Sequence, residues 1–456
     1  MTWRLQLVFL LFAMSNCHVI SQSGDDKQAD YSGYTLHRFK VDTSASTMEK
    51  LESFDVELDE TTNKARLLLD VWAEPSKSNP YADILVAPEF LEKFKSLLTS
   101  EELKSLKMLE RDIQSQINAE RHAMIRNTIR RKRNVNEMKT WNEFDANMYH
   151  SYDDMVRFMT LLAQQKSDMV EMVKVANSSE GRSVYGVKIH PPNKSIKGKP
   201  SIIVDAGVHA REWIAPAVAL FMMKKIVSEY GTNPRVTGNL DKFDWYIIPQ
   251  VNPDGYEYSR TSDRLWRKTR SKNITINRWC VGADANRNWG YRWGEAGANR
   301  TPCSNIYMGS HPYSEPEIQG LKDFFTWDIL NPMVYVSLHS YGQLLLSPWG
   351  YTNERTDNYQ DQQSAAREAA LAIKNATGVS YSYGTISEMM YPASGTSIDY
   401  MQHIGVPYIY GVELRPTDNP DSFAFNLPPS YIRATGDEML AALNAIGDHA
   451  IKVKRL

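Results

Sequence analysis

The chain is 456 residues long, with 42% hydrophobic and 23% charged residues, which is the composition of a globular protein with a sizeable core. This length exceeds that of one ordinary domain, so we expect two domains. Lys and Arg number 52 against 54 Asp and Glu, a formal net charge of -2, so the bulk charge gives no reason to expect binding to nucleic acid or to an anionic membrane.

The N-terminus has the features of a secretory signal peptide. Arg4 precedes an apolar run from Leu5 to Met14, and small and polar residues follow around Ser15 and Ser21. A membrane anchor is the alternative, but the run is about half of the roughly 20 residues that span a bilayer. We therefore expect residues 1–21 to be a signal peptide and the protein to be secreted and extracellular, with no membrane partner.

The cysteines agree with that compartment. Cys17 lies in or near the segment that would be removed, which leaves Cys280 and Cys303 as the remaining pair. In an oxidising compartment the pair predicts one local disulfide, worth about 3 kcal/mol by the chain-entropy model. Two buried free thiols are the alternative.

Residues 22–133 have the pattern of a small α+β domain followed by a connector. β-branched and apolar runs predict strands, and helical spacing of apolar residues predicts helices between and after them. The expected strands are 34–41, 65–73 and 82–87, and the expected helices are 48–58 and 90–103. Such a unit of about 90 residues is large enough to fold alone.

A charged, mostly helical connector follows from Met108 through Ile125 and ends in the tetrabasic run Arg130 to Arg133. The run could be a solvated helix end, and a nuclear signal would contradict the signal peptide. Cleavage by a processing or trypsin-like protease suits an exposed, charged linker best. We therefore expect an activating protease as a partner.

Residues 134–456 have the pattern of a larger α/β domain. Near-continuous apolar strands predict a mixed, mostly parallel sheet that helices cover on both faces. The expected strands are 199–205, 243–248, 333–339 and 407–413, and the expected helices are 213–230, 315–327, 362–374 and 429–452. In such sheets ligands bind beyond the carboxyl ends of the strands.

Polar residues fall at those ends. His209, Asn252, His339 and Glu413 each lie at or just after the end of an expected strand. His209 and Glu212 are three residues apart at a strand-to-helix turn, close enough to bind one ion, and a catalytic zinc takes three protein ligands. We choose His339 as the third ligand, although a histidine at a strand end is by itself more often a hydrogen-bonded structural residue.

The residues around these positions resemble the pancreatic-type zinc carboxypeptidases, the A/B group, and the resemblance covers the propeptide, the connector and the whole second domain. It rests on five segments in order: Gly207 to Pro216, Asn252 to Tyr256, Arg264 to Arg270, Asp284 to Trp289, and Glu413 to Arg415. The resemblance implies one zinc ion, held by His209, Glu212 and His339, and peptide substrates with a free C-terminus. It also implies that residues 22–133 are an activation propeptide whose α+β domain is of the ferredoxin-like kind.

The resemblance also implies two catalytic roles. Glu413 matches the carboxylate that takes a proton from the attacking water and passes it to the leaving amine. Its alternative is a buried salt bridge with Arg415. Arg267 matches the arginine that stabilises the oxyanion, and its alternative is a solvated arginine in a basic loop.

Further matches concern the substrate. Asn286 and Arg287 match the clamp for the terminal carboxylate, which a planar guanidinium suits well. Arg211 matches a secondary substrate-binding arginine, and Tyr391 matches a mobile tyrosine that closes over the substrate; a packed-down aromatic is the alternative.

Ile398 occupies the place at the floor of the specificity pocket where basic-specific relatives carry an aspartate, so the floor favours apolar side chains. Ordinary core packing is the alternative, and a register slip of one residue would make Asp399 the selector instead. Gly350 and Gly411, which also match pocket positions, leave room for a bulky ring, whereas Thr396 narrows the pocket. The stretch from residue 416 to residue 425, which is longer than in the pancreatic enzymes, also leaves fine specificity open.

Together these features predict a monomeric precursor whose prodomain inhibits an A-like zinc exopeptidase. A basic-specific (B-type) enzyme with the same chemistry is the nearest alternative. A catalytically inactive binding relative and a structural secreted glycoprotein without metal are the others.

Overall fold

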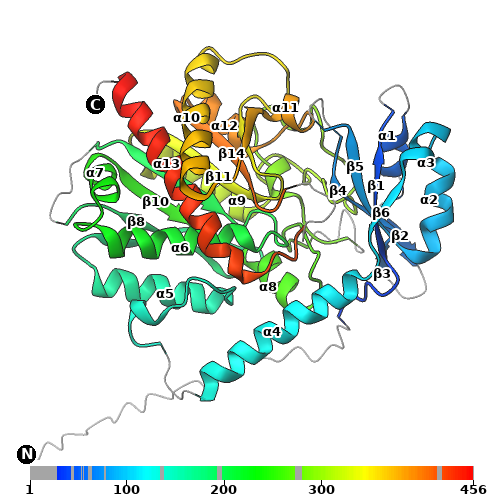
Figure 1. Ribbon diagram of the computed structural model, residues 1–456, viewed down its shortest axis with the longest axis horizontal. Helices are drawn as coiled ribbons and strands as arrows, with labels where there is room; N and C mark the ends of the chain where they lie inside the picture. The colour runs from blue at the N-terminus through cyan, green and yellow to red at the C-terminus, as the bar shows by residue number, and fades with distance from the viewer. Residues whose placement is uncertain are drawn as a thin grey trace, which may run out of the picture.

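The computed structural model describes residues 28–42, 46–52, 54, 56–59, 64–75, 79–133, 138–192, 198–272, 280–417 and 424–454. The expected signal peptide, residues 1–21, lies outside these ranges. Two domains follow one another along the chain, and a long helix, α4, runs from the first beneath the second (Figure 1). In the described part of the chain no helix is long and apolar enough to cross a bilayer.

The first domain is an antiparallel sheet with the strand order β4-β5-β1-β6, which has helices on its outer side and faces the second domain with the other (Figure 1). Its core includes Phe39, Ile84 and Phe94. Its elements are β1 (Thr35–Lys40), α1 (Thr47–Glu52), β2 (Val56–Asp59), β3 (Lys64–Leu67), β4 (Leu69–Ala73), β5 (Tyr81–Val86), η1 (Pro88–Phe90), α2 (Leu91–Leu97), α3 (Ser100–Ser105), β6 (Lys107–Glu110) and α4 (Ile113–Arg133). The α+β prediction for this domain is confirmed.

Several expected elements of this domain are divided. The expected helix 48–58 ends at Glu52, and residues 56–59, whose apolar and polar residues alternate, form β2. The expected strand 65–73 is two strands, because β3 pairs with β2 and β4 pairs with β5. The expected helix 90–103 breaks before Thr99, whose capping box with Glu102 starts α3.

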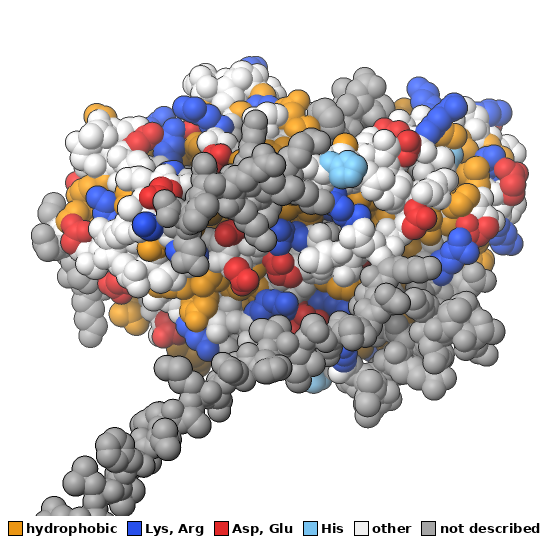
Figure 2. Space-filling model, turned by 90° about the horizontal axis from the view of Figure 1, so that it is seen from below, with side chains coloured by type: hydrophobic (Ala, Val, Ile, Leu, Met, Phe, Trp, Pro, Cys, Tyr) orange, Lys and Arg blue, Asp and Glu red, His pale blue; other side chains and the backbone are white. Residues whose placement is uncertain are grey.

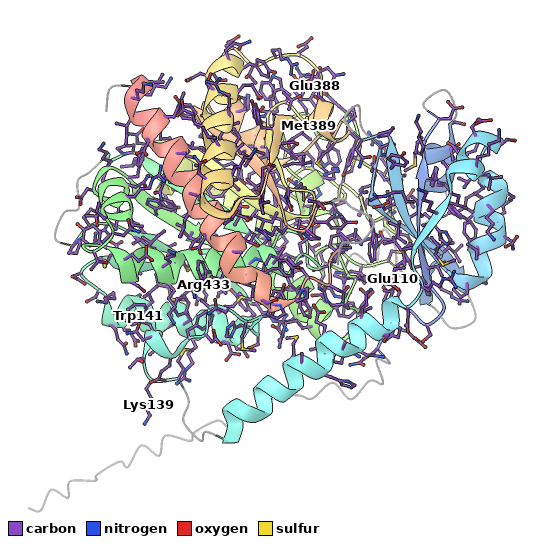
Figure 3. The ribbon with its side chains drawn as sticks, viewed as in Figure 1. Glu110, Lys139, Trp141, Glu388, Met389 and Arg433 are labelled. Atoms are coloured by element: carbon purple, nitrogen blue, oxygen red, sulfur yellow. A yellow bond between two sulfur atoms is a disulfide. The ribbon has the colours of Figure 1, made fainter. Side chains whose placement is uncertain are left out.

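The start of the connector also differs from the prediction. Residues 107–110 form β6, which pairs with β1 at the edge of the sheet. Glu110, labelled in Figure 3, ends this strand, and its carboxylate accepts hydrogen bonds from the backbone N–H groups of Arg111 and Asp112 at 2.7 and 3.0 Å. The chain thereby turns directly from β6 into α4.

The second domain contains a mixed eight-stranded sheet with the order β13-β12-β14-β11-β9-β10-β8-β7. The four central strands, β14, β11, β9 and β10, are parallel. The strands are β7 (Val170–Asn177), β8 (Ser183–Ile189), β9 (Ser201–Ala206), β10 (Asp244–Ile248), β11 (Pro332–Ser340), β12 (Leu344–Ser347), β13 (Ser382–Thr385) and β14 (Tyr408–Leu414). The four central strands are the four that the sequence predicts; the outer strands were not predicted.

Helices cover both faces of this sheet, as predicted. Helices α5, α6, α10 and α13 bury one apolar cluster against one face, and α9 and α12 bury a second cluster against the other. The helices and helical turns are η2 (Trp141–Glu143), α5 (Tyr152–Gln165), α6 (Ile214–Glu229), α7 (Pro234–Lys242), α8 (Pro253–Thr261), η3 (Ala285–Arg287), α9 (Pro316–Asp323), η4 (Phe324–Asp328), α10 (Tyr359–Thr377), α11 (Ile386–Met389), α12 (Ser397–His403), η5 (Pro429–Tyr431) and α13 (Ile432–Lys454).

The expected helix 315–327 is α9 followed by the π-helical turn η4, and the expected helix 429–452 begins with the 3-10 turn η5. Cys280 and Cys303 form the predicted disulfide, with their Cα atoms 4.9 Å apart.

In Figure 2, acidic and basic side chains are interspersed over the face seen from below. Among the side chains coloured in Figure 2, positive and negative charges are mixed, and no large patch of one sign is seen on this face.

Candidate active site

A cavity of about 390 Å³ lies beyond the carboxyl ends of the central strands, a volume typical of small-molecule and peptide sites. Strand β9 leads into the turn that carries His209, and β11 ends beside His339. His339 is the parallel neighbour of Glu413 on β14, so the register alone brings these two side chains together. All ten residues of the second domain for which the sequence predicts a metal, catalytic or substrate role line this cavity.

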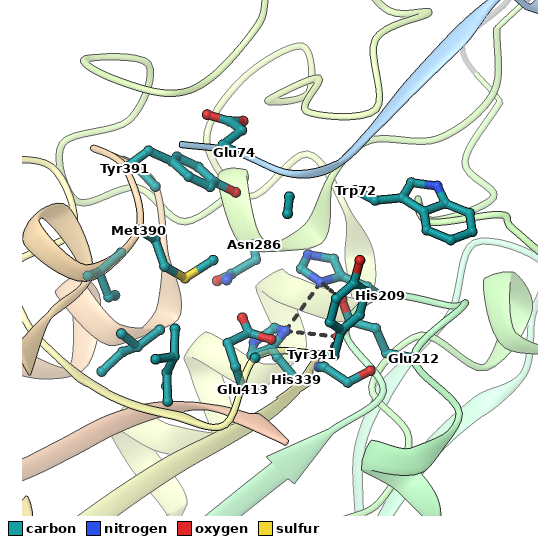
Figure 4. A pocket seen from close by; sticks show the side chains of 18 of the residues that line it. Trp72, Glu74, His209, Glu212, Asn286, His339, Tyr341, Met390, Tyr391 and Glu413 are labelled. Carbon is teal, nitrogen blue, oxygen red and sulfur yellow. Dashed lines mark hydrogen bonds and ion pairs between the residues drawn. The ribbon is translucent and has the colours of Figure 1, made fainter. Parts of the chain in front are cut away.

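Three donor groups converge at the base of the cavity (Figure 4). His209 Nδ1 lies 2.8 Å from Glu212 Oε1, and His339 Nδ1 lies 3.2 Å from both His209 Nδ1 and Glu212 Oε2. All three residues are buried. Although burial alone would raise the pKa of Glu212, the two histidines hold it below its usual value, so the carboxylate stays charged.

The hydrogen bonds of the outer ring nitrogens, Nε2 of His209 and of His339, show whether the cluster of His209, Glu212 and His339 fits a metal ion. His209 Nε2 lies 3.2 Å from Asp284 Oδ1, and His339 Nε2 lies 3.1 Å from the Ser337 hydroxyl. A ring N–H engaged on the outside leaves the lone pair of Nδ1 pointing inward, which is the arrangement that metal-binding histidines adopt. Two inward nitrogens and one charged carboxylate suit a zinc ion.

Asp284, which is fully buried, holds two parts of the site together. It contacts His209 through Oδ1, and its Oδ2 accepts hydrogen bonds from Arg267 Nε at 3.1 Å and Nη2 at 2.8 Å. Burial would raise the pKa of Asp284, but the Arg267 guanidinium and His209 hold it well below its usual range. Asp284 lies in one of the segments that carry the family resemblance, but the sequence predicts no role for it. The general expectation that a ligating histidine has an outer hydrogen-bond partner is the only signal, and it does not say which residue that partner is.

Glu413 lies beside His339, its neighbour on the next strand, and faces the cavity (Figure 4). Burial raises its pKa to about 8, and the Glu212 carboxylate acts in the same direction, against the opposing effects of His339 and Arg267. A carboxylate that gives up its proton only near neutral pH can both accept and return one. The alternative reading, a salt bridge between Glu413 and Arg415, does not occur, because Arg415 pairs with Glu438.

Arg287 and Tyr391 lie at the far end of the cavity. The Arg287 guanidinium is held by the carbonyl oxygens of Gly297 at 2.6 Å and Asn286 at 3.0 Å. The Tyr391 hydroxyl lies 3.3 Å from Arg287 Nη2, so the ring points into the cavity (Figure 4). The Asn286 side chain accepts a hydrogen bond from the Ser397 N–H at 3.1 Å, which ties it to the start of α12.

Ile398 and Asp399 separate at the start of α12. Ile398 lines the cavity, whereas Asp399 is fully buried and accepts hydrogen bonds from the N–H groups of Gly350 at 2.7 Å and Tyr351 at 3.0 Å. Of these two neighbours, Ile398 therefore lines the cavity and Asp399 does not. Thr396 also lines the cavity, but its hydroxyl caps α12 by accepting the Asp399 N–H at 3.2 Å.

Arg211 is covered by the first domain. Its guanidinium pairs with Asp70 of β4 and lies 4.3 Å from the centroid of the Phe425 ring. Asp70 also accepts hydrogen bonds from Asn305 Nδ2 at 2.7 Å and from the Trp72 indole at 2.9 Å. Residues 70–74 thus form one wall of the cavity. Of the expected longer stretch near the pocket, residues 418–423 lie outside the described residues.

Comparisons with known proteins match both domains. Residues 155–442 match the family model for zinc carboxypeptidases, and residues 55–120 match the model for carboxypeptidase activation peptides. The chain is 34% identical to carboxypeptidase A1 of Bos taurus over 92% of this chain and 95% of the relative. It is 36% identical to carboxypeptidase A2 of Mus musculus, over 84% of this chain and 87% of the relative.

A B-type relative is similar too: carboxypeptidase B of Astacus astacus is 37% identical over 67% of this chain and 97% of its own length. The solved structure of thrombin-activatable fibrinolysis inhibitor has a TM-score of 0.76 at 29% identity, covering 92% of this chain and 98% of that one. The fold is shared as well with carboxypeptidase A from Helicoverpa armigera, with a TM-score of 0.79, 24% identity and coverage of 93% and 99%. The chain therefore belongs to the zinc carboxypeptidase family, as a metallocarboxypeptidase that uses zinc and carries an activation-peptide domain.

Proposed function

We propose that this chain is a secreted precursor that, once cleaved after Arg133, releases single apolar residues from the C-termini of peptides. The proposed parts are a signal peptide of residues 1–21, a propeptide of residues 22–133 and a catalytic domain of residues 134–456. One observation carries the proposal: the same cavity contains His209, Glu212 and His339, which could hold a metal ion, and Arg287, which could bind a carboxylate.

In this proposal His209, Glu212 and His339 hold one zinc ion. When bound, zinc acts as a Lewis acid toward the scissile carbonyl and makes water a better nucleophile. Glu413 accepts the proton of the attacking water and returns it to the leaving amine. Its raised pKa supports this role, because a general base works best when its pKa is close to the operating pH.

Arg267 stabilises the negative charge that develops on the carbonyl oxygen. Its two hydrogen bonds to the buried Asp284 fix the guanidinium before substrate binds, so no reorganisation is needed during the reaction. One donor of this kind contributes roughly 10² to 10³ in rate.

Arg287 and Asn286 hold the terminal carboxylate of the substrate, and Tyr391 closes over it. A guanidinium fixed by two carbonyl oxygens retains N–H groups for a carboxylate, which it can bind in a bidentate fashion. An end group held at one fixed place limits hydrolysis to the last peptide bond, which is the behaviour of an exopeptidase.

The pocket beyond the clamp is apolar. Among the described residues, the carboxylates that line the cavity are Asp70, Glu74, Glu212 and Glu413, and none of these four comes from α12. Gly411 has no side chain, and a Cβ there would lie 3.6 Å from Ile398 Cγ1, so the pocket has room beside Ile398. Burial of a leucine or phenylalanine side chain would stabilise the complex by about 1.5 to 3 kcal/mol. A lysine or arginine would lose hydration there without a counter-charge.

The deciding experiment is to cleave the connector and to measure kcat/KM on matched peptides that end in Phe, Leu, Lys and Arg, with and without a chelator. We expect Phe and Leu to be released, and the chelator to abolish release. Arg released as fast as Phe would favour the B-type alternative. A zinc-loaded chain without any release would favour an inactive binding relative. Ile398→Asp is expected to shift the preference toward Arg.

A further inference from the structure

Two loops of the site come from distant parts of the chain and must keep a fixed distance. One is the turn after β9 that carries the metal-binding His209, and the other carries Arg267. A backbone hydrogen bond joins them directly, from Ala210 N–H to the Arg267 carbonyl oxygen at 3.0 Å. A second link runs through one side chain that the mechanism above does not use, Asn252.

Asn252 is fully buried, and its amide lies between the two loops. Its Nδ2 donates to the carbonyl oxygen of Val208 at 3.2 Å and to that of Lys268 at 3.0 Å. Val208 directly precedes His209, and Lys268 directly follows Arg267. One amide group therefore bonds to the backbone beside a metal-binding histidine and to the backbone beside the oxyanion arginine.

The same side chain is fixed from a third direction. Asn252 is the N-cap of α8, and its Oδ1 accepts the Gly255 N–H at 2.9 Å. The three contacts also determine the orientation of the amide, because the reverse orientation would place Oδ1 against two carbonyl oxygens that cannot donate. Both protons of the amide and one of its oxygen lone pairs are thus in use.

Gly255 packs directly against the amide. A Cβ at Gly255 would lie 2.5 Å from both Asn252 Nδ2 and the Lys268 carbonyl oxygen, a distance that real contacts do not reach. Glycine at this position therefore lets the first turn of α8 approach the Arg267 loop closely enough for the bond to form.

We propose that Asn252 is a positioning residue, which sets the spacing between the metal-binding turn and Arg267 and so acts on the reaction through that arginine. The proposal rests on the role of Arg267 in the proposed function. Only an amide meets the three contacts: a carboxylate would face two carbonyl oxygens without a proton, and a hydroxyl has one proton for two acceptors.

The test uses the cleaved full chain and the variants Asn252→Asp and Asn252→Ser. Both keep an oxygen that can cap α8, so the helix start is retained while the two amide bonds are lost. We expect one zinc per chain, a KM within about threefold of wild type, and a kcat lower by about 100-fold, because a displacement of about 1 Å in an active site costs a factor of this size.

Asn239→Ser is the matched control. Asn239 is also buried, with 3% of its surface exposed, and its Oδ1 accepts the Trp245 indole N–H at 3.0 Å, away from the cavity. We expect this variant to lower the melting temperature and to leave kcat unchanged. A general loss of stability is thereby separated from an effect on the reaction.

The decisive measurement repeats Asn252→Ser in an Arg267→Ala background. If Asn252 acts through Arg267, the second change costs less than about threefold in kcat there. The same loss in both backgrounds, or a wild-type kcat in the single variant, overturns the proposal. A wild-type chain that releases no C-terminal residue would instead refute the proposed function itself, so the two failures are distinguishable.

Discussion

At the scale of single residues, the cavity contains two carboxyl groups whose pKa values are shifted in opposite directions. Glu212 is held charged by two histidines, whereas burial and the charge of Glu212 raise the pKa of Glu413 to about 8. Groups whose surroundings separate their pKa values in this way are suited to different tasks. One carboxylate is suited to binding a cation, and the other to moving a proton.

The first prediction concerns Glu413→Gln. Glutamine has nearly the same shape but cannot accept a proton, so we expect the variant to fold and to retain one zinc ion per chain. Its kcat should fall by roughly 10² to 10⁴, the usual contribution of a general base. Steady-state kinetics and metal analysis on the same sample measure both quantities. A rate within about tenfold of wild type would remove Glu413 from the mechanism.

At the scale of elements, the first turn of α9 packs against the loop after β7 through a buried carboxylate. Glu317 is fully buried, and its Oε1 accepts the Ser179 N–H at 2.9 Å, while its Oε2 is buried without a hydrogen-bond partner among the described residues. Burial raises the pKa of Glu317 to about 7, and the nearby Glu315 and Asp254 act in the same direction. Burial therefore favours the protonated form of Glu317 in the folded protein, although the hydrogen bond from Ser179 acts in the opposite direction.

This contact predicts a particular dependence of stability on pH. The unfolded chain loses the Glu317 proton near its ordinary pKa of 4.5, whereas the folded protein keeps it to about 7. The contribution of Glu317 to the free energy of unfolding is therefore largest below pH 4.5. It is lost as the pH rises to about 7, by about 3 kcal/mol at most.

We expect Glu317→Gln to remove this loss, because an amide stays neutral at every pH in this range. Thermal unfolding between pH 5 and 8 should then show a flatter profile for the variant and a higher melting temperature at pH 8. Glu354→Gln, at an exposed glutamate, is the matched control and should follow the wild type. Parallel profiles for Glu317→Gln and wild type would contradict the assignment.

At the scale of the whole molecule, the first domain closes the cavity of the second. β4 places Asp70 against Arg211, and the Trp72 ring lies 5.2 Å from that of Phe425. At a second point, α4 contributes Glu120, which pairs with the buried Arg264. Both contacts converge on one region of the second domain, because Arg264 also donates to the carbonyl oxygens of Arg211 and Phe425. The first domain is therefore anchored beside the cavity wall that it forms, and it is held there at high effective concentration for as long as the connector is intact.

The uncleaved precursor is therefore expected to be nearly inactive, and cleavage after Arg133 to release activity. Asp70→Ala should raise the activity of the uncleaved chain by about tenfold or more, since removing one partner leaves a buried Arg211 charge unpaired. Glu92→Ala, in an exposed ion pair of α2, is the control and should have no effect. Full activity of an uncleaved Arg133→Ala chain would show that the prodomain does not inhibit.

Local sequence patterns were enough to predict the central strands, the main helices and part of the site. The continuous apolar runs of β9 and β11 and the helical spacing in α6 and α13 are local patterns, so the central strands and main helices were predictable. The His209 and Glu212 turn is local too. His339 and Glu413 could be added because parallel strands end at the same edge of a sheet. The resemblance to one family then suggested the arginines, Tyr391 and Ile398.

Only the tertiary structure decided which partners the buried polar groups have. Asp284 joins His209 to Arg267, Asn252 joins the two loops, and Asp70 covers Arg211, in each case between separate elements of the fold. The outer strands β12 and β13 were also missed, because they pair with distant segments. The hairpins β7–β8 and β2–β3 and the break at Thr99 are local features, and the sequence patterns for them were overlooked. Periodicity reports which side of an element is buried, whereas the identity of a hydrogen-bond partner depends on how the whole chain is folded.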